Sequence, residues 1–153
     1  MSSLSGWLGH EFTGAYAGSK FALEGVVESL ARETAHLGIK TLLVEPGQFR
    51  TRLLSPGNAL SEVSRIDDYA DQSRALIGSF AAADEKQRGD PAKAVQIVLD
   101  FVRGEGVVAG RKREELPLRV PLGPDCYEVL KMKSEETLGL LREWEGVINS
   151  TDL

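Results

Sequence analysis

Only two short segments of this sequence have the pattern of β-strands, and each stands between segments with helical spacing. Residues 40–45 read KTLLVE, are mostly apolar or β-branched, and end at Pro46-Gly47, which predicts a buried parallel strand. Residues 116–123 read LPLRVPLG, and their two prolines predict a short strand at the edge of a sheet. Because helical and strand-like segments alternate, we predict an α/β fold with parallel strands, although two strands are very few for such a layer.

The longest helical segment is predicted from about residue 15 to residue 36. Its apolar positions 23, 26, 27, 30 and 31 follow helical spacing, which places Glu24, Glu28 and Arg32 on another face. Gly38 follows the end of the pattern and is the expected C-cap.

Three further helices are predicted. A weak pattern covers residues 66–87, and a last helix is expected over residues 124–148. Residues 91–103 have the clearest boundaries, because Asp90 is suited to the N-cap, Pro91 to the first helical position and Gly104 to the stop. In that helix, apolar positions 94, 95, 98, 99 and 102 form one face, and Lys93, Gln96, Asp100 and Arg103 lie opposite.

Composition excludes several classes of function. The chain has 153 residues and a net charge of −5, which argues against nucleic acid as a partner because phosphates require a basic face. Its single cysteine, Cys126, allows neither an intrachain disulfide nor a multi-thiolate metal site, so we expect a reducing, cytoplasmic location. No apolar stretch has the length of a signal peptide core or of a membrane span.

Tyr16 and Lys20 stand four residues apart at the head of the long helical segment, so both project from the same side of a helix. A phenol ionises at a pH of about 10 and is a poor acid or base at neutral pH. A lysine ammonium nearby stabilises the phenolate, which makes the hydroxyl a usable proton donor or acceptor. Ser2 and Ser3, in the glycine-rich run that precedes Tyr16, are candidate hydroxyls for the same site.

These residues resemble the catalytic segment of the short-chain dehydrogenase/reductase family. That segment has Ser-Ser-x-x-Gly, then Tyr-x-x-x-Lys, and later a strand that ends in Pro-Gly. This chain has SSLSG at 2–6, YAGSK at 16–20 and VEPGQFRT at 44–51, and SKFALEG at 19–25 is also typical of the family. The resemblance implies the C-terminal, catalytic half of such an enzyme, with a partial, doubly wound Rossmann-like layer.

The resemblance also implies a role for each matching residue. Ser3, thirteen residues before Tyr16, matches the serine that orients the substrate carbonyl. Tyr16 matches the general acid/base, and Lys20 matches the residue that tunes the tyrosine and hydrogen-bonds the nicotinamide ribose. The segment that lies along the nicotinamide and its phosphates is matched by Pro46, Gly47, Gln48, Phe49 and Thr51.

The reaction implied is reversible hydride transfer between NAD or NADP and a small-molecule carbonyl or alcohol. The resemblance also implies one domain over residues 1–153, which comprises a catalytic segment 1–51, a lid or substrate region 52–88 and a helix-strand-helix segment 89–153.

The glycine-rich turn that holds the dinucleotide pyrophosphate in this family, Thr-Gly-x-x-x-Gly-x-Gly, has no counterpart after either predicted strand. Catalysis would therefore need a dinucleotide-binding half from a longer chain or another subunit, or a cofactor bound in an unfamiliar way. The alternative is a shortened relative that binds no dinucleotide and acts as a binding or scaffold protein or as a cofactor-free catalyst. A fragment or a mis-started gene model is the third interpretation.

The remaining distinctive residues have plainer interpretations. His10 and His36 are expected at the surface, and a packed, structural Cys126 is favoured over a thiol whose pKa is lowered near a helix start. Trp7 could line a substrate pocket, whereas Trp144 is expected to pack the last helix. Five apolar residues form either a lid over substrate or core contacts under a loop: Leu53, Leu54, Leu60, Val63 and Ile66.

Small residues at Gly18, Ala22, Gly25 and Ser29 form a stripe on the long helix, and the matching helix of this family commonly builds a dimer interface. Close packing of this helix on its own sheet would explain the stripe equally well. The first strand would also have an open edge. We therefore predict a homodimer or higher homo-oligomer. Light scattering at micromolar concentration checks this prediction, and a monomer mass would contradict it.

Overall fold

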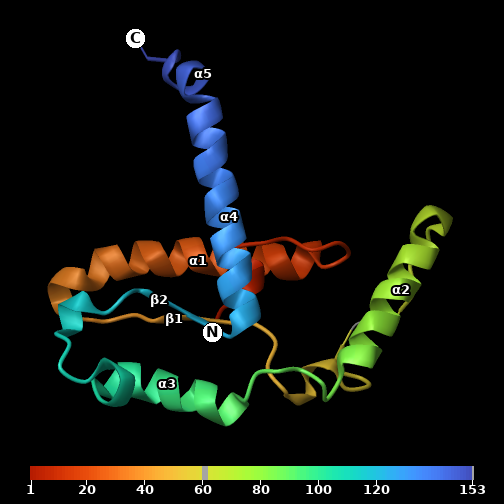
Figure 1. Cartoon of the computed structure of the whole chain (residues 1–153), viewed down its shortest axis with the longest axis horizontal. Helices are drawn as coiled ribbons and strands as arrows, with labels where there is room; N and C mark the ends of the chain where they lie inside the picture. Colours follow the sequence, from red (N-terminus) through yellow and green to blue (C-terminus); the bar gives the residue numbers. More distant parts are fainter. Residues whose placement is uncertain (60–61, 153) are drawn as a thin grey trace. The chain divides into compact units, whose positions relative to one another are not determined.

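The computed structural model describes residues 1–59 and 62–152 (Figure 1). Its helices and strands are α1 (Gly14–Thr34), β1 (Leu43–Pro46), α2 (Asp67–Ala83), α3 (Pro91–Arg103), β2 (Arg119–Leu122), α4 (Pro124–Glu143) and α5 (Glu145–Asn149). These form two compact units: a first unit of residues 1–47 and 118–153, and a second unit of residues 48–117. None of the described helices is both long and apolar enough to cross a membrane.

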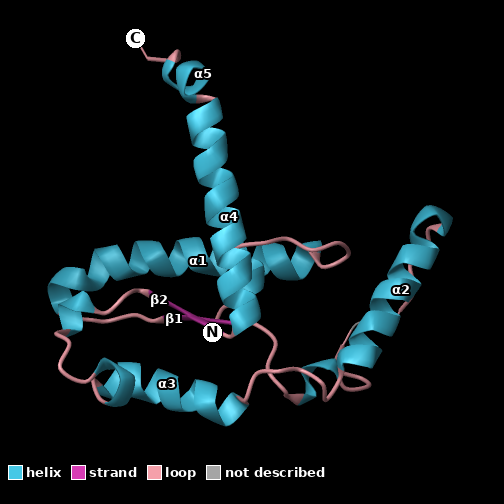
Figure 2. Ribbon diagram, viewed as in Figure 1, coloured by secondary structure: helices cyan, strands magenta, loops and turns pink. Residues whose placement is uncertain are grey.

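The first unit contains a parallel pair of strands (Figure 2). Leu43 of β1 is paired with Arg119 of β2, and the ladder continues to Pro46 and Leu122. This confirms the predicted α/β class with parallel strands. The first strand begins at Leu43 and not at Lys40, because the pairing starts only after Pro117, a residue whose ring removes a ladder donor.

The second edge of β1 carries a contact from the N-terminal segment. The backbone N–H of Ser2 donates to the carbonyl oxygen of Val44 at 2.8 Å. Ser3 is extended and leads into a short 3-10 helix, η1 (Leu4–Gly6), which packs against α1. The segment that contains the two serines is thereby tied to the sheet on one side and to α1 on the other.

Helix α1 has the predicted length, but its polar face was predicted wrongly. Glu24 is only 6% exposed, whereas the apolar side chains of Val26 and Leu30 are 65% and 43% exposed. The reason lies in β2, whose Arg119 provides a cation for Glu24 and thereby draws that face inward. The predicted cap is confirmed: a 3-10 turn follows α1, and Gly38 ends it in the left-handed conformation.

The last helical segment differs from the prediction in two respects. It is divided at Trp144, where α4 ends and α5 begins. Trp144 itself is 51% exposed, so the expectation that it packs the last helix was wrong. The buried residue of α4 is Cys126, in its first turn.

In the second unit, the predicted boundaries of α3 are confirmed. The carboxylate of Asp90 accepts hydrogen bonds from the backbone N–H groups of Ala92 and Lys93, Pro91 opens the helix, and Gly104 stops it. Helix α2 ends at Ala83, before the predicted residue 87.

The face assigned to Asp100 is a correction. Asp100 was predicted on the polar side of α3, yet it is only 5% exposed. Its carboxylate accepts from Gln96 Nε2 at 2.8 Å and from the backbone N–H of Val107 at 3.1 Å. The carboxylate is therefore buried because it anchors the loop that follows α3, and Gly106 provides the space beside it.

Gly106→Ala should destabilise the protein more than Gly104→Ala. Both glycines have positive φ, at 53° and 74°, so either alanine costs about 1 kcal/mol of backbone strain. A Cβ at Gly106 also collides with the carboxylate of Asp100, whereas one at Gly104 meets open space. We expect a further loss of about 1–2 kcal/mol in the free energy of unfolding for Gly106→Ala, measured by urea denaturation. Equal losses in the two variants would contradict this account of Asp100.

Candidate functional site

Tyr16 and Lys20 lie one turn apart at the start of α1, as the spacing predicts. The Lys20 Nζ atom is 5.5 Å from the centre of the Tyr16 ring, and it donates to the carbonyl oxygen of Met1 at 3.3 Å. The Tyr16 side chain is 47% exposed, so solvent and small molecules can reach it. The structure thus places an ammonium beside an accessible phenol, next to the N-terminal segment.

Ser3 lies in that N-terminal segment and is buried. Its Oγ atom accepts a hydrogen bond from the backbone N–H of Ser5 at 3.2 Å, which caps η1. Because η1 packs on α1, the structure brings the serine segment to the helix that carries Tyr16 and Lys20. The hydroxyl of Ser3 can donate its proton while it accepts from Ser5.

The turn after β1 begins in the first unit. Gly47 donates its N–H to the carbonyl oxygen of Leu122 at 2.8 Å, which keeps Pro46 and Gly47 at the end of the parallel pair. The carboxylate of Asp125, in the first turn of α4, lies against Gly47, where any Cβ would collide with it. Only glycine fits this position without movement of Asp125.

The other predicted cofactor residues belong to the second unit. Gln48 is exposed and accepts from the Gly89 N–H at 3.2 Å, while Phe49 forms a parallel bridge with Gly89. Thr51 caps a 3-10 turn and lines a shallow, open hollow together with Arg52, Leu53 and Asn58.

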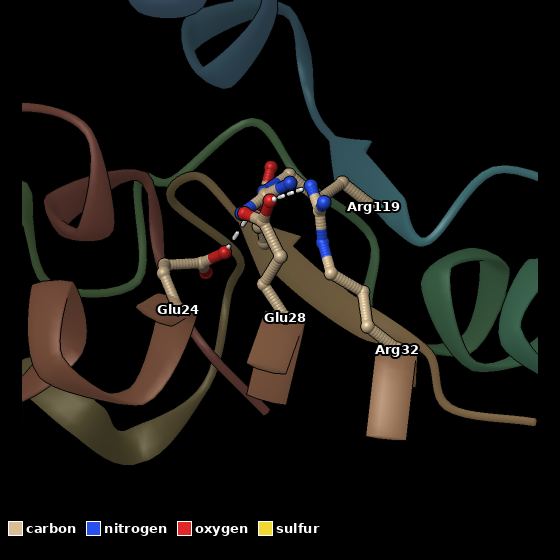
Figure 3. Close-up of polar contacts among 5 residues, drawn as sticks. Glu24, Glu28, Arg32 and Arg119 are labelled. Carbon is tan, nitrogen blue, oxygen red and sulfur yellow. Dashed lines mark hydrogen bonds and ion pairs between the residues drawn. The ribbon is translucent and has the colours of Figure 1, made fainter. Parts of the chain in front are cut away.

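A buried charged cluster in the first unit was not predicted. Arg119 of β2 extends its guanidinium to three carboxylates: Nε is 3.1 Å from Glu24 Oε2 and 3.4 Å from Glu45 Oε1, and Nη2 is 2.7 Å from Glu28 Oε2. Figure 3 shows Glu24 and Glu28 on one face of α1, with Arg119 reaching them from the strand and Arg32 paired to Glu28. We call Glu24, Glu28, Glu45 and Arg119 the arginine cluster.

Glu45 is the most buried member of the arginine cluster, with no exposed surface. Burial raises the pKa of its carboxyl group to about 7, and the negative charge of Glu24 adds to the rise, against the opposing influence of Trp7 and Arg119. Glu28 behaves in the opposite way, because hydrogen bonds from Arg119 and Arg32 lower its pKa. The cluster therefore combines an ionised outer carboxylate with an inner carboxyl group that holds its proton near neutral pH.

Comparisons with known proteins identify the family. The family described as short chain dehydrogenase matches residues 1–60. The chain is 31% identical to a 3-ketodihydrosphingosine reductase of Bacteroides thetaiotaomicron over 140 residues, which cover 90% of this chain and 47% of that protein. It is 33% identical to oxidoreductase BOA17 of Botryotinia fuckeliana over 148 residues, which cover 94% and 48%.

A solved structure agrees. The crystal structure of a short-chain dehydrogenase from Streptomyces avermitilis matches 99% of this chain with a TM-score of 0.74 at 36% identity. The chain belongs to the short-chain dehydrogenase/reductase family. It spans about half the length of these relatives, since it covers 51% of the solved chain and under half of the two named enzymes.

Membership of the short-chain dehydrogenase/reductase family allows the described residues to be tested against a dinucleotide. The nicotinamide end of a dinucleotide is compatible with the described residues, because an exposed phenol, an ammonium and the turn at the end of β1 are present. The pyrophosphate does not fit at the start of α4, the helix that directly follows β2, because Asp125 places a carboxylate in its first turn. Among the described strands, neither β1 nor β2 is followed by a three-glycine turn.

Two of the plainer interpretations are now decided. Cys126 is a packed, structural residue: it is fully buried, its thiol donates to the carbonyl oxygen of Glu45 at 3.1 Å, and burial raises its pKa to about 11. The favoured interpretation of Cys126 is therefore confirmed, and the alternative of a lowered pKa is not. Trp7 covers the guanidinium of Arg119, 5.8 Å from the ring centre, so its aromatic surface belongs to the arginine cluster.

The apolar residues of the predicted lid are mostly at the surface of the second unit. Leu53, Val63 and Ile66 are 65%, 37% and 59% exposed, and Leu54 is partly buried. Core contacts under a loop are thus the wrong interpretation for the three exposed residues. Leu60 lies outside the described residues.

The arginine cluster had a signal in the sequence that periodicity alone does not reveal. A glutamate stands inside the apolar run of the first strand, and an arginine stands between the prolines of the second. In the observed register Arg119 is opposite Leu43, and Glu45 is two residues further on, so both side chains emerge on the same face of the sheet. Only the register brings them together.

The raised pKa of Glu45 predicts a stability that falls as the pH rises. The folded protein keeps this proton up to about pH 7, whereas the unfolded chain releases it near the ordinary glutamate value of 4.5. Between those values the unfolded state binds fewer protons, so the free energy of unfolding should fall by about 1.4 kcal/mol per pH unit and level off above pH 7.

Urea denaturation at several pH values measures this slope. Glu45→Gln keeps an uncharged side chain at every pH and should remove the slope, whereas Glu128→Gln, at an exposed position of α4, should retain it. A slope that survives in Glu45→Gln would show that other groups cause it.

Proposed function

We propose that this chain supplies the catalytic half of an NAD- or NADP-dependent oxidoreductase that interconverts a small-molecule carbonyl and its alcohol. The observation that carries the proposal is the pairing of Tyr16 and Lys20 on the accessible start of α1, beside the serine segment. Family membership and the placement of the Pro46–Gly47 turn at the carboxyl end of β1 support it. In parallel α/β layers this end of the strands is where ligands bind.

In the proposed reaction Tyr16 passes the proton. During reduction its hydroxyl donates to the carbonyl oxygen as negative charge develops there, and during oxidation the phenolate accepts the alcohol proton. Lys20, whose ammonium lies 5.5 Å from the centre of the Tyr16 ring, would hold the phenol in place beside the ribose. The Ser3 hydroxyl donates to the same carbonyl oxygen and fixes its direction.

The nicotinamide cofactor would be held by the residues that match the cofactor segment of the family. Tyr16 and Lys20 would hold the ribose, and the segment after β1 would lie along the nicotinamide and its phosphates through Pro46, Gly47, Gln48, Phe49 and Thr51. When bound, the cofactor supplies or removes the hydride. The pyrophosphate would be held by a dinucleotide-binding half that is contributed by a longer chain or by another subunit.

A homo-oligomer is consistent with this arrangement. The stripe of small residues on α1 faces solvent, since Gly18, Ala22, Gly25 and Ser29 are all exposed. A Cβ added at Gly18 or Gly25 would meet nothing within 4 Å, so close packing of the stripe on the chain's own sheet does not explain it. We infer that a second copy covers the stripe.

A chimera tests the proposed function directly. The part of the Streptomyces avermitilis dehydrogenase that this chain does not match would be joined to it, and NADH and NADPH oxidation would be followed with a panel of carbonyl compounds. We expect turnover that falls by about 100-fold or more in Tyr16→Phe and Ser3→Ala, since each removes a proton donor to the reacting oxygen. Lys20→Ala should weaken nicotinamide binding as well, measured by the fluorescence of NADH.

Tyr127→Phe is the matched control, because that phenol is 60% exposed on α4 and should leave turnover unchanged. If the chimera binds neither NADH nor NADPH at millimolar concentration, the proposal is wrong and a binding, scaffold or cofactor-free role is favoured. Turnover that is retained in Tyr16→Phe would also contradict it.

A further inference from the structure

Four residues of chemical interest follow one another on a single face of α1. Tyr16, Lys20, Glu24 and Glu28 are each separated by four residues, so their side chains emerge one turn apart. The first two belong to the proposed proton-transfer site, and the last two belong to the arginine cluster. Contacts that fix the positions of Glu24 and Glu28 therefore also fix those of Tyr16 and Lys20, because α1 is stiff over this length.

Arg119 provides these contacts, since it connects α1 to the sheet. Its Nε contacts Glu24 from α1 and Glu45 from β1, and the guanidinium itself comes from β2. Few groups could replace it, because the planar guanidinium directs several N–H donors in fixed directions, which a lysine ammonium does not.

The charges of the buried part do not balance unless a proton is present. Glu24 and Glu45 are 6% and 0% exposed, and Arg119 is the cation that contacts both. Two buried carboxylates at one site do not both ionise, because their repulsion is strong where water is excluded. Glu24 Oε1 and both carboxyl oxygens of Glu45 are buried without a hydrogen-bond donor among the described residues, so a proton on Glu45 can be donated to Glu24 Oε1.

The groups that face Glu45 come from every element packed on it. They are Glu24 from α1, Trp7 after η1, Arg119 from β2 and Cys126 from α4; Glu28 pairs with Arg119, and Asp125 acts on the Cys126 thiol. Apart from Arg119, none of these carries a positive charge.

The serine segment is anchored to the same place. Ser2 is held to β1 through its N–H bond to Val44, and its Oγ lies 3.0 Å from the point where a Cβ of Gly6 would stand. Glu24 Oε1 is 3.2 Å from that same point. The serine segment is therefore held to the sheet through Ser2 and to α1 through η1, and Glu24 lies beside the Ser2 hydroxyl.

We propose that Arg119, Glu24 and Glu45 are positioning residues that hold α1, and with it Tyr16 and Lys20, in register with the serine segment through one shared proton. The inference rests on the proposed function, because it concerns the geometry of the same site. Loss of the shared proton places a second negative charge beside Glu24 and separates the Glu24 turn of α1 from β1. Tyr16, two turns away, then shifts relative to Ser3.

Two spectroscopic signals test the proposal in the chain alone, without turnover. Trp144→Phe leaves Trp7 as the only tryptophan, so its fluorescence reports the arginine cluster. Tyrosine labelled with ¹³C at the ζ carbon gives one NMR signal for each of the three tyrosines, and the Tyr16 signal reports the proposed site. Both signals are followed from about pH 5 to about pH 9.

We expect the Trp7 and Tyr16 signals to change with one common midpoint close to pH 7, the value at which Glu45 loses its proton. Glu45→Gln should abolish both changes. Glu24→Gln should move both midpoints to lower pH, because it removes the charge that favours protonation of Glu45. This variant tests the proposal if Glu45→Gln does not fold. Arg32→Ala is the matched control: among the described residues Arg32 pairs with the outer Glu28 alone, from an exposed position, and its loss should leave both midpoints in place.

Two results would overturn the proposal. If the Trp7 fluorescence changes with pH but the Tyr16 NMR signal does not, the cluster has a structural role alone. If neither signal changes, no proton is shared. The proposed function fails in a different experiment. A common midpoint of the Trp7 and Tyr16 signals, without any turnover in the chimera, would support the positioning inference and contradict the proposed oxidoreductase function.

Discussion

The guanidinium of Arg119 is the interaction on which the first unit depends. The sheet consists of two four-residue strands, and such a pair buries too little surface to fix a long helix by apolar contact alone. Arg119 joins α1 to both strands with directional, charge-assisted contacts. These contacts set the rotation of α1 about its own axis, and that rotation decides which residues of its first turns face the serine segment.

These buried ion pairs have an energetic cost that apolar packing does not have. Charges are removed from water, and each buried carboxylate requires a cation or a proton. Here one guanidinium serves two inner carboxyl groups, so the remaining charge is neutralised by protonation of Glu45. The arrangement fixes geometry more strictly than leucines would, because ion pairs have preferred directions whereas apolar contacts tolerate sliding.

Much of the fold follows from local sequence. Asp90, Pro91 and Gly104 bound α3 through backbone chemistry that depends on neighbours alone, and Tyr16 and Lys20 had to share a face once the helix was recognised. The burial of Glu24 and Asp100 could not be predicted in this way, because each is buried by a partner far along the chain or in a later loop. Helical periodicity assigns every charge to the outside, and it fails where the structure supplies a cation or N–H donors on the inside, as Arg119 does for Glu24 and as Gln96 and Val107 do for Asp100.

The buried thiol of Cys126 has a practical consequence. It is the only cysteine of the chain, it has no exposed surface, and its high pKa keeps it in the unreactive protonated form. Maleimide dyes and thiol-reactive spin labels should therefore not react with Cys126 in the native protein. Cysteines introduced singly at exposed sites could be labelled without first replacing the native one, so distances between chosen points are open to resonance energy transfer and pulsed EPR in an otherwise unaltered molecule.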